Sequence, residues 1–291
     1  MKVNRRTFIR TFAAACAAGN ASYVQAQQLS NNFLFGIRTE PDMAAQLKAV
    51  GYDFIEIGVA TSLKPEISDE AFAPEMERLK NCALPIRSCN QFIPPQLKLV
   101  GPLADHDKAL KYAITACRRA GALGIPYIIL GSGAARRVPV GFDPAEAKIQ
   151  FIDFCQKLGD LIKDLKVTVI IEQLNKSETN LINTLTECCD YVDAIERERI
   201  KLLADFYHMS KDGEDSGAIL KAGNRILHCQ IAERENRMAP GTYGEDFSAF
   251  FKALKDIGYR GGISCESSWP AQNIEAAWIK ALKTMRSQAG F

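Results

Sequence analysis

Four oxygen-bearing side chains stand directly after short apolar runs of the sequence. The runs and the residues that follow them are TVII before Glu172, KLLA before Asp205, ILHC before Gln230 and GISC before Glu266. Two glutamates and an aspartate that met in one low-dielectric pocket would repel one another strongly, and a divalent cation would relieve that repulsion. Three carboxylates and one amide form a hard, oxygen-rich ligand set, which suits magnesium or manganese, with cobalt as a further candidate, better than copper or a structural zinc.

These four residues meet only if the runs that precede them are strands of one sheet. From residue 33 onward, apolar runs alternate eight times with amphipathic stretches. The predicted strands cover residues 33–38, 52–58, 86–92, 127–133, 168–175, 200–208, 226–233 and 262–267. The predicted helices cover residues 42–50, 69–82, 105–122, 144–165, 184–196, 215–221, 247–257 and 274–287. This alternation predicts the α/β class and a (β/α)8 TIM barrel, in which the carboxyl ends of all strands meet at one mouth.

The period of a strand predicts which side chains share the barrel interior. Side chains alternate between the two faces of a strand, so His228 lies on the same face as Gln230 and one layer deeper. We therefore interpret His228 as a core or second-layer histidine, with metal ligation as the alternative. Any one of the four oxygen-bearing residues alone would be explained as an exposed loop residue, but four at equivalent strand ends are not.

A doubly wound open sheet is the alternative architecture for alternating strands and helices. The glycine-rich dinucleotide-binding turn is missing after the first predicted strand. Gly131-Ser132-Gly133, after the fourth, lacks both the third glycine and a helix directly following. No internal repeat or linker divides the chain, so we predict that residues 30–291 form a single catalytic barrel domain.

Composition and charge exclude several classes of partner. Hydrophobic residues make up 47% and charged residues 24% of the chain, as in soluble globular proteins. A net charge of +2 with scattered basic residues predicts no nucleic-acid partner. After the N-terminal segment no apolar stretch predicts stable membrane insertion. A homo-oligomer is compatible with the sequence.

The first 26 residues are predicted to be a targeting signal. Arg5 and Arg6 precede a weakly hydrophobic, alanine-rich stretch, and VQA before residue 27 is typical of a cleavage site. The pattern resembles a twin-arginine export signal and predicts a periplasmic or exported protein. A basic amphipathic N-terminus and lipidation at Cys16 are the alternatives. Eight of the nine cysteines lie beyond residue 26 without a CxxC motif, and we interpret them as packed, reduced thiols.

Five stretches of the sequence produce a more specific resemblance. They are EQLN from Glu172, DFYHM from Asp205, HCQIAE from His228, RMAPG from Arg237 and SCE ending at Glu266. In this order and spacing the chain resembles the xylose isomerase-like barrel superfamily, in particular the branch that contains hydroxypyruvate isomerase and D-tagatose 3-epimerase. The resemblance covers essentially all of the chain after the predicted signal.

The resemblance implies that one divalent metal ion is bound by the four residues at the strand ends: Glu172, Asp205, Gln230 and Glu266. At the position of Gln230 the epimerase branch has histidine, so Gln230 is more similar to hydroxypyruvate isomerase. The resemblance also implies that Glu172 and Glu266 are catalytic. One would remove a proton next to a carbonyl and the other would return it, through an enediolate that the metal stabilises.

Three further residues are implied to bind the substrate: His208, Arg237 and Glu178. A surface arginine and a carboxylate at a helix N-terminus remain the alternatives for Arg237 and Glu178. Because phosphorylated sugars are scarce outside the cytoplasm, an exported enzyme of this kind is expected to act on a non-phosphorylated sugar.

Two other functions remain open. Isomerisation and epimerisation share their first step, proton abstraction, with β-elimination, so the protein could be a metal-dependent 3-keto-glycoside lyase. A non-catalytic periplasmic sugar- or metal-binding protein is the alternative of another class, although it would not need both glutamates. Endonuclease IV has the same fold but needs a histidine-rich trinuclear zinc site, and this chain has three histidines in all.

Overall fold

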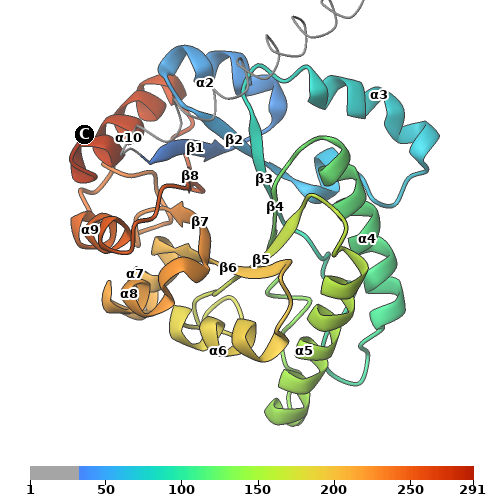
Figure 1. The fold of residues 1–291 in the computed structure, drawn as a ribbon. Helices are drawn as coiled ribbons and strands as arrows, with labels where there is room; N and C mark the ends of the chain where they lie inside the picture. The colour runs from blue at the N-terminus through green and yellow to red at the C-terminus, as the bar shows by residue number, and fades with distance from the viewer. Residues whose placement is uncertain (1–32) are drawn as a thin grey trace, which may run out of the picture. The chain divides into compact units, whose positions relative to one another are not determined.

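Eight parallel strands close into a barrel in the order in which they follow one another along the chain (Figure 1). They are β1 (Leu34–Arg38), β2 (Phe54–Gly58), β3 (Ile86–Asn90), β4 (Tyr127–Leu130), β5 (Thr168–Glu172), β6 (Ile200–Asp205), β7 (Ile226–Ile231) and β8 (Gly262–Cys265). The computed structural model describes residues 33–291, so the predicted signal at 1–26, with Cys16, lies outside the described residues. The predicted (β/α)8 barrel is confirmed.

Helices surround the ring of strands on its outside (Figure 1). The α-helices are α2 (Ala44–Val50), α3 (Asp69–Lys80), α4 (His106–Ala122), α5 (Pro144–Leu161), α6 (Leu185–Ile195), α7 (Phe206–Asp212), α8 (Gly217–Ala222), α9 (Ser248–Asp256) and α10 (Ile274–Gln288). Shorter turns are η1 (Pro41–Met43), the π-helical η2 (Val59–Leu63) and η3 (Gly223–Arg225). Among residues 33–291, no helix has both the length and the apolarity that crossing a bilayer requires.

The predicted strands run past their true ends, and the sixth is the case that matters for the site. It was predicted to cover residues 200–208, but β6 stops at Asp205. The Asp205 side chain accepts a hydrogen bond from the backbone N–H of Tyr207 and so caps α7, which starts at the next residue. His208 therefore lies in the first turn of a helix rather than on a strand.

The barrel interior contains both apolar and polar side chains. Ile129, Ile170 and Leu203 form a buried cluster inside the ring. All eight cysteines of the described region are free, and seven of them are buried, as predicted for packed thiols. The buried polar side chains at the carboxyl ends of the strands are the candidate functional residues.

Candidate metal centre and active site

The strand register brings the predicted ligands to the same end of the barrel. Asp205 pairs with Gln230 across β6 and β7, and Gln230 pairs with Ser264 across β7 and β8. Glu266 follows Ser264 by two residues and so lies on the same face, one step nearer the mouth. Glu172 is the last residue of β5.

The two carboxylate oxygens of Asp205 have different surroundings. Oδ1 accepts the N–H of Tyr207 at 2.8 Å. Oδ2 is buried and accepts no hydrogen bond from residues 33–291, although the Arg237 guanidinium lies 3.8 Å away. Burial raises the pKa of Asp205 to about 6, because the charged form loses its hydration and only part of that loss is made good by His208 and Arg237.

Glu172 is buried beside His208 and faces the cavity at the mouth of the barrel. Its pKa is raised to about 7, chiefly by burial. Its backbone carbonyl accepts a hydrogen bond from the fully buried Arg136, which also donates to the carbonyl of Leu130 and so ties β4 to β5. A Cβ atom at Gly131 would lie 2.2 Å from Glu172 Oε2, so the glycine leaves the space that this carboxylate occupies.

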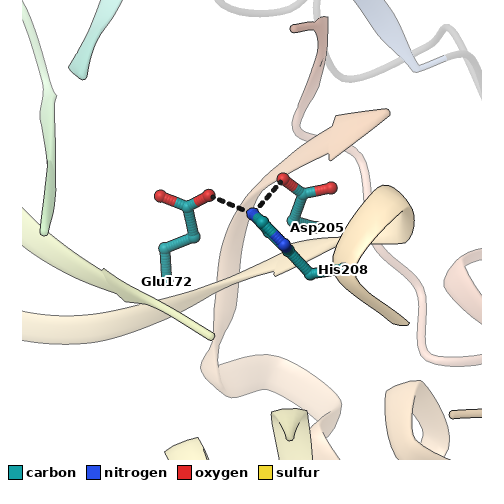
Figure 2. A group of neighbouring side chains, drawn as sticks. All are labelled: Glu172, Asp205 and His208. Carbon is teal, nitrogen blue, oxygen red and sulfur yellow. Dashed lines mark ion pairs between the residues drawn. The ribbon is translucent and has the colours of Figure 1, made fainter. Parts of the chain in front are cut away.

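His208 is oriented by a backbone group, which determines its tautomer. The N–H of Asn175 donates to His208 Nδ1 at 3.1 Å, so Nδ1 carries no proton and Nε2 carries one in the neutral ring. Burial lowers the pKa of His208 and favours this neutral form. Nε2 lies 3.3 Å from Glu172 Oε1 and 3.5 Å from Asp205 Oδ2. Figure 2 shows the His208 ring between the two carboxylates, with these ion pairs as dashed lines. In this tautomer Nε2 carries the ring N–H, and this nitrogen has no hydrogen-bond partner among the described residues.

A divalent cation fits this arrangement of oxygens. Glu172, Asp205 and His208 offer ligand atoms within 4.8 Å of one another, but in this tautomer Nε2 has no lone pair to share. Two buried oxygens without hydrogen-bond partners among the described residues, Asp205 Oδ2 and Gln230 Oε1, are better candidates. Unpaired buried oxygens and carboxylates with raised pKa values are stabilised by a nearby cation. The predicted set of Glu172, Asp205, Gln230 and Glu266 stays the prediction for the ligands.

A second polar layer lies beneath these oxygens, and its central residue was not predicted from the sequence. Glu56 on β2 is fully buried and accepts hydrogen bonds from Gln230 Nε2 at 2.8 Å and from Ser88 Oγ at 2.6 Å. His228 Nε2 lies 3.2 Å from its second oxygen, which supports the second-layer interpretation of that histidine. The signal in the sequence is a single acidic residue inside the apolar run FIEIG.

Arg237 connects the carboxylates at the mouth of the barrel. Its guanidinium donates to Glu266 Oε2 at 2.7 Å and to Glu178 Oε1 at 3.3 Å, and it lies 4.5 Å from the centre of the Tyr207 ring. Asn90, at the end of β3, donates to the other oxygen of Glu266 and was not predicted either. Burial and the nearby charge of Glu172 raise the pKa of Glu266 well above its usual value.

The loop that presents Arg237 is organised by a buried carboxylate. Glu233 accepts the backbone N–H groups of Gly241, Tyr243 and Gly244 at 2.7, 2.6 and 3.1 Å. The Arg237 backbone has a positive φ of 51°, a conformation that most residues avoid. The loop 234–245 therefore holds Arg237 in a strained backbone conformation over the site.

A cavity of about 650 Å³ opens at this end of the barrel. Its lining includes Glu172, Glu178, Arg237 and Glu266, so it brings together both predicted catalytic residues and two of the predicted substrate contacts. Asp205, Gln230 and His208 are fully buried below it. An apolar wall of the cavity consists of Ile93, Pro94, Pro95, Ala134, Ala135 and Leu174.

Comparisons with known proteins agree with this architecture. The sequence profile of the family described as "Xylose isomerase-like TIM barrel" matches residues 44–288. An L-ribulose 3-epimerase of Methylomonas sp. (strain DH-1) is 30% identical over 227 residues, which cover 75% of this chain and 74% of that one. A putative hydroxypyruvate isomerase of Mus musculus is 28% identical over 170 residues, which cover 55% and 60% of the two chains.

Among solved structures, a 3-keto-D-glucoside 4-epimerase from E. coli superposes with a TM-score of 0.74. The match covers 88% of this chain and 100% of that chain at 18% identity. At that identity the likeness establishes the fold.

Proposed function

The chain belongs to the xylose isomerase-like TIM-barrel family, and on that basis we propose that it is a divalent-metal-dependent sugar isomerase or epimerase. The observation that supports this most directly is that two carboxylates with raised pKa values, Glu172 and Glu266, line one cavity above buried oxygens that accept no hydrogen bond from the described residues. The relatives named as an L-ribulose 3-epimerase and a putative hydroxypyruvate isomerase support an enzyme of the carbohydrate isomerase and epimerase type.

We assign a separate chemical role to each residue of the site. A carboxylate whose pKa is raised is a stronger base and, once protonated, can return the proton as an acid. Glu172 and Glu266 would therefore remove a proton from the carbon next to the substrate carbonyl and return it there or to the neighbouring atom. The Nε2–H of His208 would donate to a substrate oxygen, and Arg237 would orient a hydroxyl or carbonyl oxygen. Manganese or magnesium, held by the predicted ligands, would polarise the substrate carbonyl.

The charges around the cavity favour a neutral substrate. Its lining has three carboxylates, Glu172, Glu178 and Glu266, and two guanidinium groups. One of these, Arg237, is already engaged by Glu178 and Glu266, which leaves Arg38 at the mouth. A phosphate is usually held by several cationic or N–H donors. We therefore propose a non-phosphorylated sugar as the substrate.

A keto-glycoside lyase is the second candidate, and the apolar wall of the cavity supports it. A pocket of this size lies within the range, about 300 to 1,000 Å³, that holds drug-sized ligands. The apolar wall would cover the aglycone of a glycoside while the sugar ring faces the carboxylates. The similarity to a 3-keto-D-glucoside 4-epimerase makes keto-glycosides worth testing alongside free ketoses.

Solvent isotope exchange tests the proposal and separates the candidates. Manganese-loaded protein is incubated in D2O with ketoses and with 3-keto-glycosides, and the products are examined by NMR and mass spectrometry. Deuterium in an intact sugar indicates an isomerase or epimerase, whereas release of an aglycone with an unsaturated keto-sugar indicates a lyase. Neither product from any substrate, with metal bound, would favour a binding protein and contradict the proposed chemistry.

We also propose that the protein is exported through the twin-arginine signal of residues 1–26. A chain that begins at residue 27 should fold with an unchanged melting temperature. Mass spectrometry of protein from the native host should detect the mature form outside the cytoplasm. Full-length, uncleaved protein confined to the cytoplasm would refute the proposal.

A further inference from the structure

Glu56 holds the centre of the second polar layer without reaching the cavity. Its Oε1 lies 2.8 Å from Gln230 Nε2, and its Oε2 accepts the Ser88 hydroxyl and faces His228 Nε2. The side chain is fully buried, and it is absent from the cavity lining. Glu56 therefore acts on its neighbours on β3 and β7.

The contact with Gln230 determines which end of an amide faces the site. A carboxylate has acceptors only, so the NH2 group of Gln230 must turn toward Glu56. The carbonyl Oε1 of Gln230 then points away from Glu56 and accepts no hydrogen bond from residues 33–291. Gln230 pairs with Asp205, whose Oδ2 likewise accepts no hydrogen bond from the described residues, so these two oxygens belong to neighbouring strands.

We propose that Glu56 is a positioning residue that fixes the Gln230 carboxamide with its oxygen toward the bound cation. The proposal rests on the metal site of the proposed function. A cation is bound by the amide oxygen and is repelled by the N–H hydrogens, so a reversed amide would replace a ligand with a repulsive group. The carboxylate on β2 excludes the reversed orientation because it has no hydrogen to donate to the Gln230 oxygen.

Replacing Glu56 by glutamine removes this control while keeping size and burial. The new amide could accept from the Gln230 NH2 group or donate to its oxygen, so both orientations become possible. In chelator-stripped protein without substrate, we expect Glu56→Gln to weaken Mn²⁺ binding by about 10- to 100-fold, the usual effect of losing a group that orients a ligand. The Kd is measured from the EPR signal of free Mn²⁺.

An exchange of the two residues provides the matched control. In the double variant Glu56→Gln, Gln230→Glu the donor and acceptor swap strands, the total charge is unchanged, and position 230 still offers an oxygen to the cation. The exchange should restore most of the affinity that Glu56→Gln loses. We therefore expect the double variant to bind Mn²⁺ at least about tenfold more tightly than Glu56→Gln alone. Ser88→Ala removes a partner of the other Glu56 oxygen and should change the Mn²⁺ Kd by less than about twofold, a shift too small to imply a lost ligand.

Unaltered Mn²⁺ affinity in folded Glu56→Gln, or a double variant no better than the single one, would overturn the positioning role while leaving the metal site intact. Wild-type protein that binds no Mn²⁺ would overturn both. NMR on the wild type covers the case in which a variant does not fold. The Gln230 NH2 protons should be protected from solvent exchange with and without Mg²⁺, and its carboxamide ¹³C shift should move when Mg²⁺ is added. Freely exchanging NH2 protons or an unmoved carbon would contradict the proposal.

Discussion

Glu266 enters the cavity from the end of β8 and Glu172 from the end of β5, so a sugar held between them would be reached from two sides of the barrel. Glu266→Gln keeps an oxygen and nearly the same volume but removes the proposed base. We expect kcat to fall by about 100-fold or more, as for other positioned acid–base groups. KM should change much less, because the lost interaction belongs to the transition state. Steady-state kinetics on the substrate identified by isotope exchange measure both.

The matched control is Glu275→Gln, the same chemical change at an exposed position of α10. It should leave kcat and KM unchanged. A Glu266→Gln enzyme that retains wild-type kcat would exclude Glu266 from proton transfer.

A second prediction at the scale of single residues concerns Gly131. A methyl group there would meet Glu172 Oε2 at 2.2 Å and would push the carboxylate aside. Displacement of a reacting group by about 1 Å is able to reduce the rate by about 100-fold, so we expect a loss of that order in Gly131→Ala. Gly121→Ala in α4, where the nearest atom would be 3.8 Å away, should be fully active and slightly more stable. Wild-type activity in Gly131→Ala would mean that the reaction rate does not depend on the present position of the Glu172 carboxylate.

At the scale of elements, the loop 234–245 depends on Glu233. Three backbone N–H groups of the loop donate to this buried carboxylate. Glu233→Gln removes the charge and one acceptor, which we expect to reduce the free energy of unfolding by about 1 to 3 kcal/mol. Because Arg237 lies in this loop, KM should rise more than kcat falls.

Denaturant titration and kinetics measure the two effects, and limited proteolysis reports on the loop itself. Glu235→Gln changes an exposed residue of the same loop and should behave as wild type. Equal loop cleavage in Glu233→Gln and wild-type protein would contradict the organising role of Glu233.

At the scale of the whole molecule, the cluster of acids makes stability depend on pH and metal. The pKa of Glu172 rises from 4.5 to about 7 on folding, and that of Asp205 from 3.8 to about 6. A folded state with raised carboxyl pKa values binds more protons than the unfolded chain, so these groups make stability fall as pH increases through this interval. This loss of stability is complete once both carboxyl groups are ionised in the folded protein.

Chelator-treated protein should therefore melt at a lower temperature at pH 8 than at pH 5, and the gain in melting temperature on adding Mn²⁺ should be larger at pH 8. A bound ion stabilises the folded state, and its binding displaces the protons. Differential scanning fluorimetry at fixed ionic strength measures both trends. A Mn²⁺ effect that did not increase with pH would argue against Glu172 and Asp205 as ligands.

The sequence was sufficient for the barrel and for the superfamily, and both predictions are confirmed. The apolar runs before Glu172, Asp205 and Gln230 are read from local periodicity alone. Glu56 and Asn90 were missed because their roles depend on side chains more than 170 residues away, as the pairs with Gln230 and Glu266 demonstrate. Helix α7 was missed because the apolar residues after Asp205 continue the hydrophobicity of β6, and a side-chain cap rather than a change of composition ends the strand.

Asp205 affects how loss-of-function data from this family member should be interpreted. One of its oxygens accepts a hydrogen bond from the first turn of α7, and the other accepts none from the described residues. Because His208 lies in that first turn, Asp205→Ala would release the helix terminus and the His208 ring, and it would also remove the predicted metal ligand. Loss of such a cap reduces stability by about 0.5 to 2 kcal/mol. Asp205→Asn keeps an oxygen for the cap, so we expect it to lose metal affinity at nearly wild-type stability, whereas Asp205→Ala should lose both. Comparing the two variants would separate the effect on metal binding from the effect on the capping of α7. An alanine substitution alone combines both effects in a single loss of function.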